Sequence, residues 1–177
     1  MEEKSFKINV DTNDKLTNFD LMKATENNKL KTVKALIKQG ANINTTDKNG
    51  RTALRKAAEW GFLDVIKVLI KHGVNVNNAD NNGWTALMAA AEEGYLDIIK
   101  FLIKNGANVN ATDKDGWTAL MSAAEGDHRA VAKILIKHGA DINIETKCGW
   151  TALMGTSEGS YLSIVKYLKK KRYASAR

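Results

Sequence analysis

A 33-residue repeat is the feature of this sequence that most constrains its fold. Two series of glycines keep this interval without a slip: Gly50, Gly83, Gly116 and Gly149, and Gly40, Gly73, Gly106 and Gly139. Each glycine of the first series precedes a run such as Trp84-Thr85-Ala86-Leu87, and each glycine of the second precedes a run such as Ala107-Asn108-Val109-Asn110. A period of this size is typical of solenoids, in which each unit packs only against its neighbours.

Each unit is predicted to fold as a turn, a helix, a short turn and a second helix. The run Asp47-Lys48-Asn49-Gly50 has turn chemistry, and Thr52 behind it can cap the first turn of a helix. Apolar residues recur at helical spacing in both predicted helices, for example Leu87, Ala90 and Ala91, and then Ile98, Ile99, Leu102 and Ile103. A helix pair of this length cannot bury such stripes alone, so the copies must stack and share one core.

The repeat divides the chain into five units between short termini. We predict an extension at 1–13, an N-terminal cap at 14–46, three full repeats at 47–79, 80–112 and 113–145, a C-terminal cap at 146–172 and a tail at 173–177. The end units carry charged residues, such as Asp20, Lys23 and Lys169, at positions that are apolar or small in the inner units. Terminal units of a solenoid need such polar outer faces.

On these motifs, the chain resembles the ankyrin repeat family over nearly its whole length. The family pattern D-x-x-G-x-T-P-L-H-x-A-A-x-x-G, followed by an apolar helix and G-A-D-V-N, is matched from Asp80 to Asn110 with few changes. The resemblance implies an all-α solenoid of about five stacked helix-turn-helix units with short β-turn tips that pair loosely. It also implies that a partner protein is bound on a concave face made of the tips and the first helices. One departure is Asp127, which replaces a Gly, so we expect that turn to be strained or rebuilt around Gly126.

The sequence contains no pattern of enzyme chemistry, and we expect a protein that is not an enzyme. Neither a phosphate-binding G-x-x-x-x-G-K-[ST] loop nor an H-E-x-x-H motif occurs. His128 lies near Asp127 and Glu125, but without a nucleophile or a substrate pocket a structural role is the simpler interpretation. The single cysteine, Cys148, is read as an incidental exposed thiol, and the histidines lack metal-site spacing, so we predict no metal and no cofactor.

Composition and hydropathy indicate a folded protein inside the cell. Hydrophobic residues make up 44% and charged residues 27% of the chain, which argues against wholesale disorder. No stretch approaches the roughly 18 consecutive apolar residues of a membrane span, and the N-terminal residues lack the apolar core of a secretory signal. We therefore expect a cytoplasmic, monomeric protein.

Residues that recur on the tips and first helices form the candidate partner-binding site. They are Arg51, Glu59, Trp60, Trp84, Glu92, Glu93, Trp117, Glu125, Trp150 and Glu158. Tryptophan is typical of binding hot spots, and Trp beside Glu suits a cation, so a Lys- or Arg-bearing segment of another protein would fit. Two further interpretations stay open: the Trp rings pack between repeats to stiffen the stack, and the Glu side chains merely face water.

The net charge of +7 suggests an alternative function on the opposite face. Lysines recur on the second helices, which we expect to be convex, and a basic cluster follows at 169–172. Such a surface could bind nucleic acid or anionic lipid electrostatically. Solvation of an outer helix face is the simpler explanation, and few aromatic residues are placed there to stack on bases, so nucleic acid is the less favoured partner.

Overall fold

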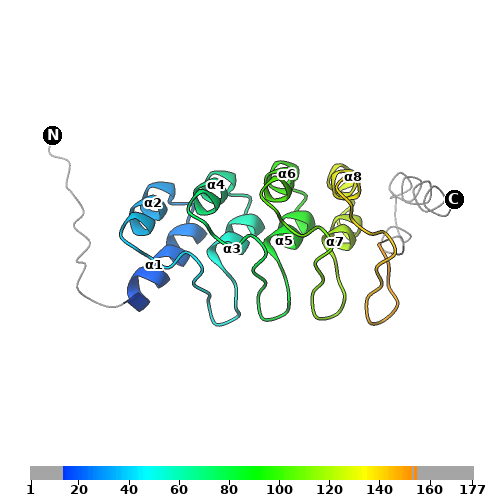
Figure 1. Cartoon of the computed structure of the whole chain (residues 1–177), viewed down its shortest axis with the longest axis horizontal. Helices are drawn as coiled ribbons and strands as arrows, with labels where there is room; N and C mark the ends of the chain where they lie inside the picture. The colour runs from blue at the N-terminus through cyan, green and yellow to red at the C-terminus, as the bar shows by residue number, and fades with distance from the viewer. Residues whose placement is uncertain (1–13, 153, 155–177) are drawn as a thin grey trace.

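The computed structural model describes residues 14–152 and Met154, and within these ranges it forms four pairs of α-helices. The inner helices are α1 (Asp14–Glu26), α3 (Ala53–Glu59), α5 (Ala86–Glu92) and α7 (Ala119–Glu125). The outer helices are α2 (Leu30–Lys38), α4 (Leu63–Lys71), α6 (Leu96–Lys104) and α8 (Arg129–Lys137). The two sets form two rows, and the tip loops project beyond the inner row (Figure 1). The predicted all-α solenoid is confirmed.

Most of the fifth predicted unit, 146–172, lies outside the described residues, as do the extension 1–13 and the tail 173–177. The division into five units therefore stays a prediction at both ends. None of the described helices has the length and apolar character that crossing a membrane requires.

Threonine caps define where the inner helices begin. The hydroxyl oxygens of Thr52, Thr85 and Thr118 accept hydrogen bonds from the backbone N–H groups three residues later, at 3.1, 3.3 and 3.2 Å. Each threonine is buried, so its hydroxyl satisfies a backbone donor that water could not easily reach. The predicted capping role of these residues is confirmed.

The core is continuous from one repeat to the next. Small residues of the inner helices, such as Ala57, Ala90 and Ala123, are fully buried, and each inner helix packs directly against its neighbours along the stack. Larger apolar residues of the outer helices, such as Leu69 and Leu102, complete the same cluster. Small side chains at the inner contacts allow the helices to approach closely, so the repeat spacing is set by these alanines.

Backbone hydrogen bonds link the tips into one ladder. The nitrogen atoms of Asn81, Lys114 and Lys147 donate to carbonyl oxygens of the preceding tips, at Asn49, Asn82 and Asp115, over 2.8–2.9 Å. Isolated β-bridges close the base of the first three tips: Thr46 with Thr52, Ala79 with Thr85, and Thr112 with Thr118. The tips therefore hold a fixed spacing through one backbone bond at each junction.

A second ladder is made by asparagine side chains in the loops that follow the outer helices in the sequence. The Oδ1 atoms of Asn44, Asn77 and Asn110 accept hydrogen bonds from backbone N–H groups of the next unit, at 3.1, 2.8 and 2.8 Å. The Nδ2 atoms of Asn77 and Asn110 also donate to the carbonyl oxygens of Gly106 and Gly139, at 3.0 and 2.9 Å. One amide thus satisfies two backbone groups of its neighbour, which explains why asparagine recurs at this position.

The turn at Asp127 is not rebuilt around Gly126. Asp127 itself takes the left-handed conformation, with φ of 53°, as Gly61 and Gly94 do at the equivalent positions, with φ of 77° and 73°. Gly126 has an ordinary φ of −77°. Aspartate tolerates this region better than most residues, and Arg129 contacts its carboxylate at 3.2 Å through two nitrogen atoms. The turn therefore keeps the geometry of the equivalent glycine turns, and the backbone of Asp127 is strained.

Candidate functional site

The first predicted column, Arg51, Trp84, Trp117 and Trp150, lies at the tip end of the inner helices. Each residue directly precedes the first-turn threonine, and its backbone N–H donates to a side-chain oxygen four residues earlier in the tip, at 2.7–3.0 Å. All four side chains are half-buried. These hydrogen bonds within the tip therefore fix the backbone position of each residue of the column.

The tryptophan rings are engaged in packing between repeats. The rings of Trp117 and Trp150 stack with their centroids 5.6 Å apart and their planes 19° apart. The Nε1 atom of Trp117 donates to the hydroxyl of Ser122 at 2.9 Å. Trp84 also packs against the core, but its buried Nε1 has no acceptor among the described residues, because Ala89 stands at the position of Ser122. These contacts favour the packing interpretation, and partner binding by the three rings stays a prediction.

The glutamate column lies at the opposite end of the same helices. Glu59, Glu92 and Glu125 are the last residues of α3, α5 and α7, and Glu93 follows directly behind Glu92. Trp60 caps the end of α3, is 56% exposed, and leans on Phe62 with ring centroids 6.4 Å apart. The structure therefore places Trp60 next to the carboxylates and separates the other three tryptophans from them by the length of a helix. Glu158 lies outside the described residues.

The carboxylates of this column repel one another electrostatically. Partial burial raises the pKa of Glu92 above its usual value, and the negative charges of Glu93, Glu125 and Glu59 raise it further. Arg55 is the one neighbour that lowers this pKa. Within the described residues, neither Glu92, Glu93 nor Glu125 forms an ion pair. Glu92, Glu93 and Glu125 therefore carry negative charge without a direct cationic partner among the described residues, whereas Glu59, next to Trp60, pairs with Arg55.

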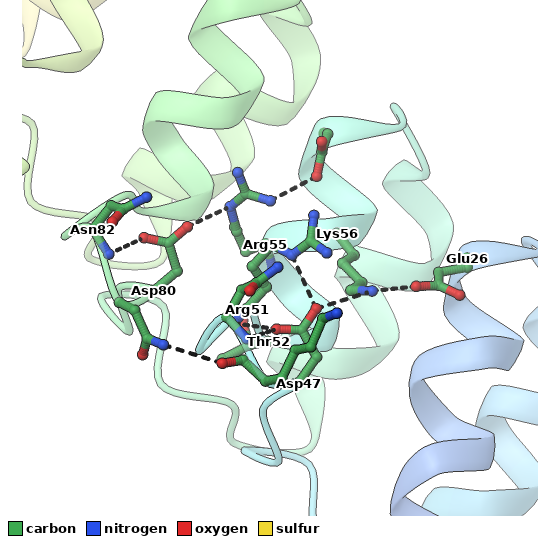
Figure 2. Close-up of polar contacts among 12 residues, drawn as sticks. Glu26, Asp47, Arg51, Thr52, Arg55, Lys56, Asp80 and Asn82 are labelled. Atoms are coloured by element: carbon green, nitrogen blue, oxygen red, sulfur yellow. Dashed lines mark hydrogen bonds and ion pairs between the residues drawn. The ribbon is translucent and has the colours of Figure 1, made fainter.

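The first full repeat carries an ion-pair network instead of the Trp and Met side chains of the later repeats (Figure 2). Lys56, which is only 7% exposed, contacts the carboxylates of Glu26 and Asp47, the latter at 3.3 Å. Arg55 contacts Glu59 at 2.7 Å and Asp80 at 3.5 Å. Sequence reasoning missed this network, although a signal was present: Arg55 and Lys56 break a column of methionine and a column of small residues.

Arg51 belongs to the same network and not to an exposed strip. Its Nε lies 2.9 Å from a carboxylate oxygen of Asp47. Burial acts to raise the pKa of Asp47, but hydrogen bonds from the backbone N–H groups of Arg51 and Asn49, together with the Arg51 side chain, outweigh it and lower the pKa below its usual value. Asp47 is therefore held as an anion in the first tip.

A polar hollow of about 590 Å³ opens between the tips and the inner helices. It is lined by polar, charged and aromatic side chains of four successive units, among them Arg55, Asp80, Trp84, Asp113 and Lys147. The hollow is therefore a polar recess that runs across the tips of neighbouring units.

The described residues offer little to catalysis or to metal binding. His128 packs over the turn at Gly94, with its Nε2 2.7 Å from the carbonyl oxygen of Glu92, which is a structural contact. No group of three or more His, Cys, Asp or Glu side chains in the described part of the chain is arranged to hold a metal ion. The lysines of the outer helices are exposed, and two of them, Lys67 and Lys100, pair with aspartates on their own helices.

Comparison with known proteins adds one finding. The model of a family described as ankyrin repeats (3 copies) matches residues 21–113 and 105–176, which together are most of the chain. No curated protein matches the sequence.

Proposed function

Because the chain belongs to the ankyrin repeat family, whose members generally bind other proteins, we propose that it is a non-catalytic module that holds a partner segment along its inner helices. The observation that carries the proposal is the combination of exposed Trp60 with the unpaired carboxylates of Glu92, Glu93 and Glu125. Tryptophan is enriched at binding hot spots, and negative charge beside it suits a basic segment.

Rigid display is the proposed mechanism. The tip ladder and the asparagine ladder fix the spacing of successive repeats before a partner arrives. A pre-organised surface loses little conformational entropy on binding, so more of the contact energy becomes affinity. We further propose that the module acts as a monomer inside the cell, where the exposed free thiol of Cys148 would remain reduced.

The test compares capture of proteins from nuclease-treated cell extract by the native chain and by two double variants. Trp60→Ala with Glu93→Gln alters the exposed surface without removing a buried group, whereas Trp84 and Trp117 pack against the core, so changing them would also affect stability. Lys71→Ala with Lys104→Ala, on the outer helices, is the matched control. We expect a captured protein, confirmed with purified partner, to be lost with the first variant and retained with the second.

The opposite outcome would contradict the proposal. If binding survives the Trp60 and Glu93 changes but is lost with the lysine variant or on adding salt, then the basic outer face is the working surface. Electrostatic binding of a polyanion loses affinity steeply with salt, so a salt titration separates the two cases.

A further inference from the structure

A groove of about 280 Å³ lies between α1 and α2, the helix pair at the N-terminal end of the stack (Figure 1). Among its lining residues, Ala24 and Leu36 are buried, Asp20 and Thr32 are half-buried, and Lys29 is exposed. The groove therefore has an apolar floor and a charged rim. An engineered cavity of about 150 Å³ already holds benzene, so the volume of this groove is enough for an aromatic ring with an aliphatic side chain beside it.

The groove lies on the face that the inner units use to contact the preceding unit. Lys23, one of its lining residues, is equivalent to Lys56, which contacts Glu26 of the preceding unit. Thr32 is half-buried, whereas Val65 at the equivalent position of the next unit is fully buried. Among the described residues no unit precedes α1, so this face of the first helix pair has no neighbouring helices to cover it.

The sequence shortly before α1 alternates strictly between polar and apolar residues. Phe6, Ile8 and Val10 alternate with polar residues from position 5 to position 11. Strict alternation over this length is typical of an extended segment with one apolar face and one polar face. The pattern therefore predicts a segment that needs an apolar surface against which to bury Phe6, Ile8 and Val10.

We propose that residues 5–11 of this chain lie in the groove as an extended segment, with Phe6, Ile8 and Val10 facing the apolar floor. The segment covers the end of the stack and takes the place that a preceding unit has at the inner repeats. This contact within the chain is separate from the proposed binding of a partner, because it does not involve Trp60 or the glutamate column.

The length of the chain permits this contact. Helix α1 begins at Asp14, and an extended chain can carry Phe6 up to about 26 Å from that point. Ala24 lies about 15 Å from the same point along the helix axis. Residues 5–11 can therefore turn back at the start of α1 and run antiparallel to this helix as far as the groove.

The charges at the far end of the groove agree with this direction. In an antiparallel arrangement, Glu2 and Glu3 follow Phe6 towards the turn between α1 and α2. Lys29 lies in that turn, and its side chain forms no ion pair among the described residues. The arrangement thus brings opposite charges together, but such exposed pairs contribute little energy, so burial of the apolar side chains is the main stabilising contribution.

The direct test is an NMR measurement on the full, isotope-labelled chain. We expect nuclear Overhauser effects between the ring protons of Phe6 and the methyl groups of Ala24 and Leu36. A sample that mixes labelled with unlabelled chains separates contacts within one chain from contacts between two copies. The expected contacts are within one chain and do not depend on protein concentration.

Two matched double variants give the second arm, with amide hydrogen exchange in α1 and α2 as the measurement. Phe6→Ser with Ile8→Ser removes most of the apolar face, so the cover is lost and exchange in these helices should become about tenfold faster. Lys7→Ser with Asn9→Ser changes the opposite face of the same segment and should leave exchange within about twofold of the native rate.

The inference is wrong if Phe6 shows no contact with Ala24 or Leu36, or if the two double variants change hydrogen exchange equally. It is also wrong if the contacts join two chains, because a second copy then covers the groove. None of these results bears on capture of a partner through Trp60, so the proposed function would stand or fall separately.

Discussion

Ala89→Ser should stabilise the protein by giving the indole of Trp84 the acceptor that it lacks. In the next repeat, the hydroxyl of Ser122 accepts a hydrogen bond from Trp117 at 2.9 Å and lies 3.4 Å from the carbonyl oxygen of Thr118, to which it can donate. Ala89 occupies the equivalent buried position, so a serine there meets the same surroundings. The substitution therefore reproduces at Trp84 the hydrogen bond that Trp117 forms with Ser122 in the next repeat.

The magnitude follows from two opposing effects. A new hydrogen bond to a buried, unpartnered donor contributes about 1–1.5 kcal/mol, and serine in a helix costs about 0.5 kcal/mol relative to alanine. The expected net gain at Ala89 is therefore about 0.5–1 kcal/mol, which corresponds to a few degrees in Tm for a chain of this size. The reverse change, Ser122→Ala, leaves the Trp117 donor unpartnered and should lower the free energy of unfolding by about 1 kcal/mol.

Urea unfolding followed by circular dichroism measures both changes, and a double-mutant cycle assigns the cause. Trp84→Phe keeps a ring in place but removes the N–H group, so Ala89→Ser should lose its benefit in that background. The reasoning is refuted if Ala89→Ser lowers the free energy of unfolding, or if its gain persists when Trp84 is phenylalanine.

Three further predictions concern single positions and are measured by the same unfolding experiment. Asn77→Ala removes two hydrogen bonds to the next unit and should lower the free energy of unfolding by about 1–2 kcal/mol. The side chain of Asn49 has no hydrogen bond among the described residues, so Asn49→Ala should change the free energy of unfolding little. Equal effects of the two substitutions would refute the role of the asparagine ladder. Asp127→Gly relieves a left-handed aspartate and should raise stability by about 0.5–1 kcal/mol, and a loss would show that the Arg129 contact outweighs the strain. Because the folded pKa of Glu92 is raised, its folded form binds a proton more tightly than the unfolded chain does, so its contribution to stability falls as pH rises above about 4.3. Glu92→Gln should therefore be more stable than the native chain at pH 7 and lose that advantage below pH 4 or so, and an advantage that grows on acidification would contradict the assignment.

The fold could be predicted from the sequence because each local signal agrees with the repeat. Thr52 and Thr85 predict helix starts by their capping chemistry, and the structure shows both caps. Gly106 predicts the end of an outer helix, and it follows that end with a φ of 87°. Agreement between turn, cap and apolar spacing at a fixed interval leaves few alternative folds.

The candidate site was harder to predict, because the sequence shows which residues recur in register but not what each side chain contacts. Trp84 and Glu92 share a unit, but the structure separates them by the length of α5. Trp60, which breaks the repeat pattern, is the ring that lies beside the carboxylates. Side chains that bridge two units, such as Arg55 and Asn77, are marked in the sequence by a break or a recurrence, but the residues that they contact in the next unit depend on three-dimensional stacking.

The unequal junctions have a consequence for cooperativity. In a linear array, the sharpness of unfolding depends on how strongly each unit is coupled to the next, and two described junctions have an ionic tie that the third lacks. As far as ionic contacts contribute, the coupling is therefore expected to be weakest between the repeats that hold Glu92 and Asp113. A substitution that supplied the missing tie would make the coupling more uniform, so it would be seen as a steeper, more nearly all-or-none melting transition.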